Sequence, residues 1–195
     1  MPTLKVTRIA LALTALAMSP LAAQALSVNV SMAGWQASGG YGASGNSQTF
    51  LSLPAGSTVT GFDYLGLAFA TTGDSWQREL VLSVNNQVAS TQWLDWQPST
   101  TAGPGSFGAA SGSWGGATGV DGPFPSTGPF VTPTGSVFVT AYLSYTVPPV
   151  GISISQGTLR VQYDIAPVPE PTTVALMLLG LAGVGAASRR LATRV

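Results

Sequence analysis

The sequence predicts an all-β domain, an antiparallel β-sandwich or jelly roll, that lies between two targeting segments. Two observations carry this prediction. About eight short stretches of apolar or alternating residues recur along the middle of the chain, separated by turns rich in Gly, Pro, Ser and Asn. In the same region, no stretch repeats its apolar residues at the spacing of a helix.

The first segment of the chain has the features of a secretory signal peptide. Residues 1–25 begin with two basic side chains, continue with the apolar run 9–18 and end on small residues at Ala23 and Ala25. A signal peptidase reads small side chains at these two positions, so we expect cleavage after Ala25 and export of the remaining chain.

The exported part is expected to extend from Leu26 to Val168 as one domain. It contains no lysine, histidine or cysteine, and its two arginines against six acids leave a net charge of −4. Nucleic acid and anionic lipid surfaces need clustered basic residues, so this charge balance argues against both as partners of the domain. Without cysteine the domain depends on burial and hydrogen bonding instead of disulfides.

Alternation of apolar and polar residues places the strands. Every second residue from Leu159 to Ile165 is apolar, which predicts a half-buried strand over residues 158–165. The same pattern predicts strands over residues 136–145 and 78–84. Further strands are predicted over residues 27–32, 49–53, 58–72 and 151–155.

A hairpin is predicted where the strand 78–84 meets Asn85 and Asn86. Asparagine tolerates the positive φ of two-residue hairpin turns, and a second strand is expected to return over residues 87–93. The stretch 58–72 followed by 75–84 is similar to the strand succession of jelly-roll sandwiches in exported bacterial proteins.

Residues 97–136 are exceptionally rich in Gly, Pro, Ser and Thr and predict a long surface loop within the single domain. Strand patterning resumes directly at Ser136. We expect the aromatic side chains of this stretch to pin it onto the domain; they are Phe107, Trp114, Phe124 and Phe130.

The side chains of the exported part restrict its chemistry. Without His or Cys, the usual zinc sites, cysteine nucleophiles and Ser-His-Asp triads are excluded, and the absence of Lys excludes Schiff bases. A pair of carboxylates of the glycosidase type remains possible, but the six acids are scattered. We therefore expect no enzyme, no cofactor and no metal, with a structural calcium ion as the alternative.

Trp93, Asp95 and Trp96 form the one constellation that suggests a ligand. Aromatic faces beside polar groups are typical of sugar-binding sites. The alternative is that both indoles pack within the domain, and a separation of three residues sends them to opposite faces of a regular strand. We expect packing for Trp93, and we leave both roles open for Trp96.

The last segment of the chain predicts a single transmembrane helix. Residues 172–187 carry no charge and would form a helix about 24 Å long, a marginal span for a bilayer core of about 30 Å. Pro171 blocks continuation of the helix towards the N-terminus. Arg189 and Arg190 are expected on the cytoplasmic side, where they extend the span.

The order of these elements resembles a known sorting signal. "VPEP", followed by "TTVALMLLGLAGVGAASRR", is similar to the PEP-CTERM tail of Gram-negative bacteria, here residues 169–195, and differs from many such tails by five further residues after the arginines. The resemblance implies that an exosortase, a membrane protease-transpeptidase, recognises Pro169, Glu170 and Pro171. Cleavage and transfer to the cell surface or exopolysaccharide would follow.

Composition and tail together predict a non-catalytic surface or extracellular-matrix protein, such as a biofilm component. Its precursor is expected in the inner membrane, with signal peptidase and exosortase as processing partners. A carbohydrate-binding module acting in the exopolysaccharide is the first alternative, and a glycan-active enzyme is a remote one.

Overall fold

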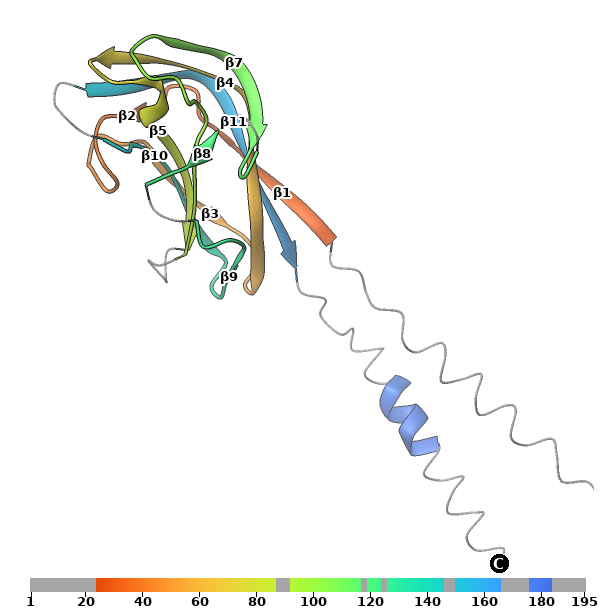
Figure 1. Cartoon of the computed structure of the whole chain (residues 1–195). Coiled ribbons are helices and arrows are strands. Elements are labelled where there is room, and N and C mark those ends of the chain that lie inside the picture. Colours follow the sequence, from red (N-terminus) through yellow and green to blue (C-terminus); the bar gives the residue numbers. More distant parts are fainter. Residues whose placement is uncertain are drawn as a thin grey trace, which may run out of the picture. The chain divides into compact units, whose positions relative to one another are not determined.

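The computed structural model describes residues 24–86, 92–116, 119–123, 126–145, 150–165 and 176–183. These residues form mainly β-strands, together with a short 3-10 helix, η2 (Gln77–Glu79), and a helix over residues 176–183 (Figure 1). The strands are β1 (Gln24–Ser31), β2 (Gln36–Ala37), β3 (Gln48–Ser52), β4 (Ser57–Gly73), β5 (Leu80–Asn86), β6 (Trp93–Gln97), β7 (Ser106–Ser113), β8 (Val120–Asp121), β9 (Phe130–Thr132), β10 (Ser136–Leu143) and β11 (Val150–Ile165).

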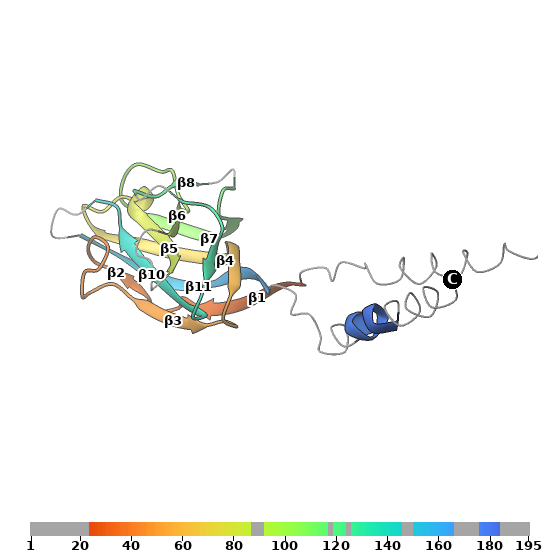
Figure 2. The same ribbon diagram turned by 90° about the horizontal axis from the view of Figure 1, so that it is seen from below.

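The strands form two antiparallel sheets (Figure 2). The first has the order β1-β11-β4-β7, with β2 added on β11 and β9 added on β4. The second has the order β3-β10-β5-β6-β8. Every pairing between described strands is antiparallel, which confirms the all-β antiparallel prediction.

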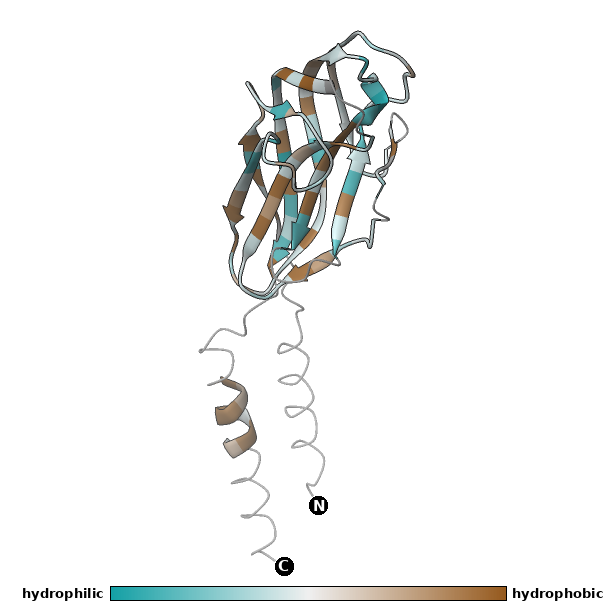
Figure 3. Ribbon diagram, turned by 90° about the vertical axis from the view of Figure 1, so that its left-hand side faces the viewer, coloured by the Kyte–Doolittle hydropathy of each residue, from teal (hydrophilic) through white to brown (hydrophobic). Residues whose placement is uncertain are grey.

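Side chains from both sheets form one apolar core. Phe62, Leu67 and Leu159 come from the first sheet, and Leu82 and Val139 from the second. The predicted core face of β10 is buried at Val137, Val139, Ala141 and Leu143, but burial does not alternate along the whole strand, because Thr140 and Tyr142 on the opposite face are buried as well. Figure 3 shows bands of different hydropathy along the strands.

Strand β11 corrects the prediction of separate strands over residues 151–155 and 158–165. It runs unbroken for 16 residues because Gly157 allows an irregularity within the strand. Gly157 has φ of 148°, a conformation that side-chain-bearing residues rarely adopt. The buried positions change from the even residue Ile154 to the odd residue Leu159 across this point, so both halves face the core.

Strand β4 has a matching irregularity beside the one in β11. Gly66 has φ of 59°, and the register with β11 shifts between the pair Ala68–Gln156 and the pair Leu65–Thr158. The two longest strands therefore change faces at the same level, and they pair on both sides of the irregularity.

The predicted two-residue turn at Asn85 and Asn86 is wrong, because both asparagines lie within β5 and are buried. β5 pairs with β6, so Trp93 is the one residue of the predicted return strand 87–93 that the structure describes within the partner strand. The Asn86 amide donates to the Val131 carbonyl at 3.0 Å, so this polar side chain is satisfied in the interior. Residues 87–91 lie outside the described residues.

The predicted surface loop 97–136 is also wrong, because it contributes strands to both sheets. β7 and β9 pair with β4, and β8 pairs with β6. Glycine serves close packing here: a Cβ on Gly119 would overlap the indole nitrogen of Trp96, and one on Gly122 would lie 2.7 Å from Cβ of Asp95. The glycines that made this segment look like a loop therefore allow it to pack closely against β6.

The aromatic residues of this segment attach it to the domain, as expected. Phe130 is buried in the core, Phe107 stacks on Phe69 with ring centroids 4.8 Å apart, and Trp114 packs against the core. Phe124 lies outside the described residues.

The two ends of the chain are described only in part. β1 begins at Gln24, which pairs with Ile165, so the expected cleavage after Ala25 would remove the first two residues of this strand. Within the described residues, no helix is both long and apolar enough to cross a membrane. The helix 176–183 covers the middle of the predicted span, and the remainder of residues 172–187 lies outside the described part. The predicted domain limits therefore stay predictions.

Gly157→Ala should destabilise the domain by roughly 1–3 kcal/mol, because a Cβ there meets φ of 148° and lies 3.2 Å from both Leu67 and Met32. Gly108→Ala is the control, because a Cβ at Gly108 meets no atom within 4 Å. Chemical denaturation of both variants measures the difference. Equal free energies of unfolding would show that the bulge at Gly157 imposes no such constraint.

Candidate functional site

The predicted sorting residues belong to the part of the tail that the structure leaves undescribed. They are Pro169, Glu170, Pro171, Arg189 and Arg190, and Ala23 of the expected signal cleavage site lies outside as well. The described helix of the tail exposes five large apolar side chains: Leu176, Met177, Leu178, Leu179 and Leu181.

The possible sugar contacts on β6 do not share one surface. Leu94 and Trp96 belong to the apolar core, and Trp96 is only 5% exposed. Trp93 and Asp95 point to the other face of the sheet, where Trp93 is half-buried and Asp95 is completely buried. The two indoles therefore lie on opposite faces, as their separation predicts, and a sugar contact by these residues stays a prediction.

Asp95 forms a buried hydrogen bond with Tyr142 of β10. The Tyr142 hydroxyl donates to Oδ2 of Asp95, across the intervening strand β5. Burial, followed by the negative charge of Asp95, raises the pKa of the Tyr142 phenol far above its usual value. The phenol therefore stays protonated as a donor, and the pair ties β6 to β10.

Tyr41 covers this pair and Trp93 from outside the sheet. Its ring lies edge-on to Trp93, with centroids 4.5 Å apart, and edge-on to Tyr142 at 5.5 Å. Its hydroxyl accepts a hydrogen bond of 3.3 Å from the Asn85 amide. Burial is the main cause that raises the pKa of Tyr41. Trp93 is therefore packed against Tyr41, as expected for a packing residue.

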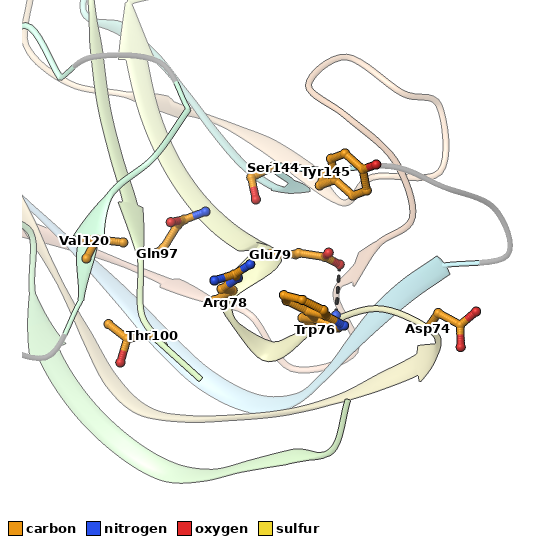
Figure 4. A pocket seen from close by; sticks show the side chains of 9 residues that line it. All are labelled: Asp74, Trp76, Arg78, Glu79, Gln97, Thr100, Val120, Ser144 and Tyr145. Atoms are coloured by element: carbon orange, nitrogen blue, oxygen red, sulfur yellow. Dashed lines mark hydrogen bonds between the residues drawn. The ribbon is translucent and has the colours of Figure 1, made fainter. Parts of the chain in front are cut away.

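A cavity of about 750 Å³ lies away from Trp93, Asp95 and Trp96 (Figure 4). The sequence did not predict a site there. The cavity is lined by Asp74, Trp76, Arg78, Glu79, Gln97, Thr100, Val120, Ser144 and Tyr145. The segment 74–79 follows β4 and contains η2, whereas the other lining residues come from β6, β8 and the chain that follows β6 and β10. One signal was available: three of the eight charged residues of the exported part cluster within 74–79, beside a tryptophan.

Hydrogen bonds within the turn around η2 hold Trp76 and Glu79 together at the cavity. The backbone N–H of Trp76 donates to Oε2 of Glu79 at 2.9 Å, and the Glu79 N–H donates back to the Trp76 carbonyl at 3.0 Å. The Arg78 guanidinium carbon lies 4.4 Å from the centre of the Trp76 ring, a cation–π contact. Trp76 is nonetheless 37% exposed and Tyr145 is 65% exposed.

The acids of the described residues do not gather into a metal site. No group of three or more Asp, Glu, His or Cys side chains within the described ranges could hold a metal ion. Asp63 instead forms an ion pair with Arg160 across β4 and β11, with 2.5 Å between Nη2 and Oδ2. The arrangement thus offers polar groups for binding, and no described acid cluster for metal chemistry.

Comparison with protein families identifies the tail. The family model described as the PEP-CTERM protein-sorting motif matches residues 167–190, so the chain carries this sorting motif in the segment whose sequence resembled it. The match covers the tail alone and leaves the β-domain unassigned. No curated protein matches the chain.

Two solved structures of viral proteins show only weak similarity. A chain of the T13 viral particle of IBDV has a TM-score of 0.23 and 11% identity, over 87% of this chain and 45% of that chain. A chain of the infectious bursal disease virus Gx strain has a TM-score of 0.22 and 11% identity, over 93% of this chain and 52% of that chain. This chain thus spans about half the length of either, and TM-scores of this size support no conclusion about fold or function.

Trp96→Ala should lower the free energy of unfolding by roughly 3–5 kcal/mol, because it empties a large site in the core. Trp93→Ala should cost clearly less, since Trp93 is half-buried on the other face of the sheet. Urea denaturation of both variants measures the order of the two effects. A larger loss for Trp93→Ala would contradict the assignment of Trp96 to the core.

The unaltered protein should lose stability as the pH rises above about 10. The unfolded chain then ionises Tyr142 at its ordinary pKa of 10.0, whereas the folded state keeps the phenol protonated, so unfolding releases a proton. Tyr142→Phe should weaken this alkaline loss and lower stability at pH 7, because Asp95 loses a donor.

Tyr145→Phe is the control for an exposed phenol. Denaturation between pH 7 and pH 11 measures the slopes. The same alkaline slope in Tyr142→Phe as in the unaltered protein would contradict the buried pair as its cause.

Proposed function

We propose that the chain is the precursor of a non-catalytic protein of the cell surface or extracellular matrix. The observation that carries the proposal is the PEP-CTERM motif at residues 167–190, which indicates an exported, surface-sorted protein. The signal peptide predicted over residues 1–25 supports the same route, since it would supply the export step that precedes sorting.

The processing order follows from the physical properties of the two ends. Signal peptidase would cut after Ala25, and the apolar residues 172–187 would hold the precursor in the inner membrane with the β-domain outside. An exosortase would then recognise the Pro169–Pro171 triplet and transfer the domain to the cell surface or to the exopolysaccharide.

We infer that the exported domain is a jelly-roll sandwich. With the two-residue and three-residue strands left aside, eight strands remain, and numbering them in chain order gives the sheet orders 1-8-3-6 and 2-7-4-5. This order supports the winding of two Greek keys, and the core shared by both sheets supports the two-layer arrangement. Such a domain forms a compact unit without disulfides, since the chain contains no cysteine.

A matrix role suits the surface chemistry of this domain. Its exported part carries no lysine and only eight charged side chains, so it has few groups for strong electrostatic partners. Carbohydrate binding is the second candidate function, because the cavity at Trp76 combines exposed aromatic rings with polar groups. We propose binding without catalysis, since one of the two carboxylates there, Glu79, closes its own turn.

Replacement of Pro169, Glu170 and Pro171 by alanine should leave an uncleaved, membrane-retained precursor, because the exosortase would lose its recognition triplet. Fractionation of cells that produce the full chain, followed by mass measurement of the tail, checks this. Thr193→Ala is the control, because Thr193 follows the matched residues 167–190, and it should be processed normally. Delivery of the triple variant to the medium or matrix as efficiently as the unaltered protein would contradict the sorting function.

A further inference from the structure

The cavity at Trp76 is the strongest candidate for a binding site that the sorting function does not explain. We propose that it binds a neutral saccharide unit of an extracellular polysaccharide. The inference rests on the second candidate function, carbohydrate binding at this cavity, and specifies which class of saccharide binds there. The site differs from the β6 residues Trp93, Asp95 and Trp96, none of which lines the cavity.

The size and walls of the cavity suit a sugar ring. Its volume of about 750 Å³ lies inside the range of roughly 300–1,000 Å³ that is usual for small-molecule sites. Trp76 and Tyr145 line it and keep 37% and 65% of their surface exposed. Because a domain without disulfides gains stability by burying such rings, their exposure beside a cavity indicates a contact surface for the apolar faces of a ligand.

The polar groups of the cavity suit hydroxyls. The Gln97 amide can both donate and accept, as can the hydroxyls of Thr100 and Ser144, and Asp74 adds a carboxylate acceptor. Figure 4 shows Gln97, Thr100 and Val120 on the left, Asp74 on the right, Ser144 and Tyr145 at the top, and Trp76, Arg78 and Glu79 between them. A ligand in the cavity therefore meets hydrogen-bonding groups and aromatic rings together, and the hydroxyls of a sugar use both.

The charges of the cavity favour a neutral ligand over an acidic one. Asp74 and Glu79 against Arg78 leave one net negative charge among the lining residues, and the whole exported part carries −4. The Arg78 guanidinium already lies over the Trp76 ring. A uronic acid or phosphorylated sugar would therefore meet repulsion, and a neutral hexose or N-acetylhexosamine would not.

The turn over residues 74–79, which carries Trp76, is held in place by hydrogen bonds within the protein. Backbone hydrogen bonds join the Arg78 N–H to the Thr101 carbonyl at 3.1 Å and the Ser144 N–H to the Glu79 carbonyl at 2.8 Å. These bonds and the Trp76–Glu79 contacts hold the turn from both sides. Binding then costs little ordering of the protein, which favours measurable affinity for a weakly interacting sugar.

The test is a glycan array of neutral and acidic oligosaccharides, probed with the full chain purified in detergent, followed by calorimetric titration of the oligosaccharides that bind. We expect binding to neutral glycans, with Kd below about 1 mM for the best of them. Trp76→Ala and Tyr145→Ala should each weaken that binding roughly tenfold or more, as expected for aromatic anchors. Trp76→Phe should recover part of the loss.

Phe50→Ala is the matched control, because Phe50 is 54% exposed but does not line the cavity; it should bind as the unaltered chain does. Tyr145→Ala should keep its melting temperature, so that lost binding does not reflect unfolding. Absence of binding to every neutral glycan, tighter binding to acidic glycans, or unchanged affinity in Trp76→Ala would overturn the proposal. The Pro169–Pro171 triple variant should bind normally, so failure of sorting and failure of the saccharide site are measured separately.

Discussion

The ladder between β4 and β11 is the interaction on which the first sheet depends. β11 also pairs with β1 and β2, and β4 also pairs with β7 and β9, so every strand of this sheet attaches to one of these two. The ladder joins residues that lie 77 to 106 positions apart in the sequence, and its register shifts where Gly66 and Gly157 allow both strands to change faces together. Without that paired irregularity, half of each strand would turn polar residues towards the core, which the second sheet shares.

The second sheet has no disulfide, and its strands are joined across β5 by a buried hydrogen bond and by ring contacts. The Tyr142–Asp95 hydrogen bond ties β10 to β6, and Tyr41 closes over it. On the other face of β6, Trp96 completes the core, and Gly119 lets the neighbouring segment approach its indole. The turn that carries Trp76 is held separately, by the backbone hydrogen bonds from Arg78 to Thr101 and from Ser144 to Glu79.

Local patterning predicted the strands, and long-range packing decided what patterning could not. Alternation predicted the buried face of β10 and the opposite faces of Trp93 and Trp96, because both depend only on the period of a strand. It split β11 in two, since the bulge at Gly157 interrupts the alternation that defines a strand. Glycine-rich composition suggested a loop over residues 97–136, because sequence alone does not distinguish glycine that permits flexibility from glycine that permits close packing. The cavity was missed because its walls come from segments that meet only after the sheets have formed.

We infer that the β4–β11 ladder and the shared core make both sheets one cooperative unit. Native-state hydrogen exchange of the full chain measures this cooperativity. We expect the central amides of β4, β11, β5 and β10 to exchange only through global unfolding, with the same free energy of opening. A free energy of opening for β4 and β11 that is about 2 kcal/mol lower than that for β5 and β10 would show that the two sheets do not unfold as one unit.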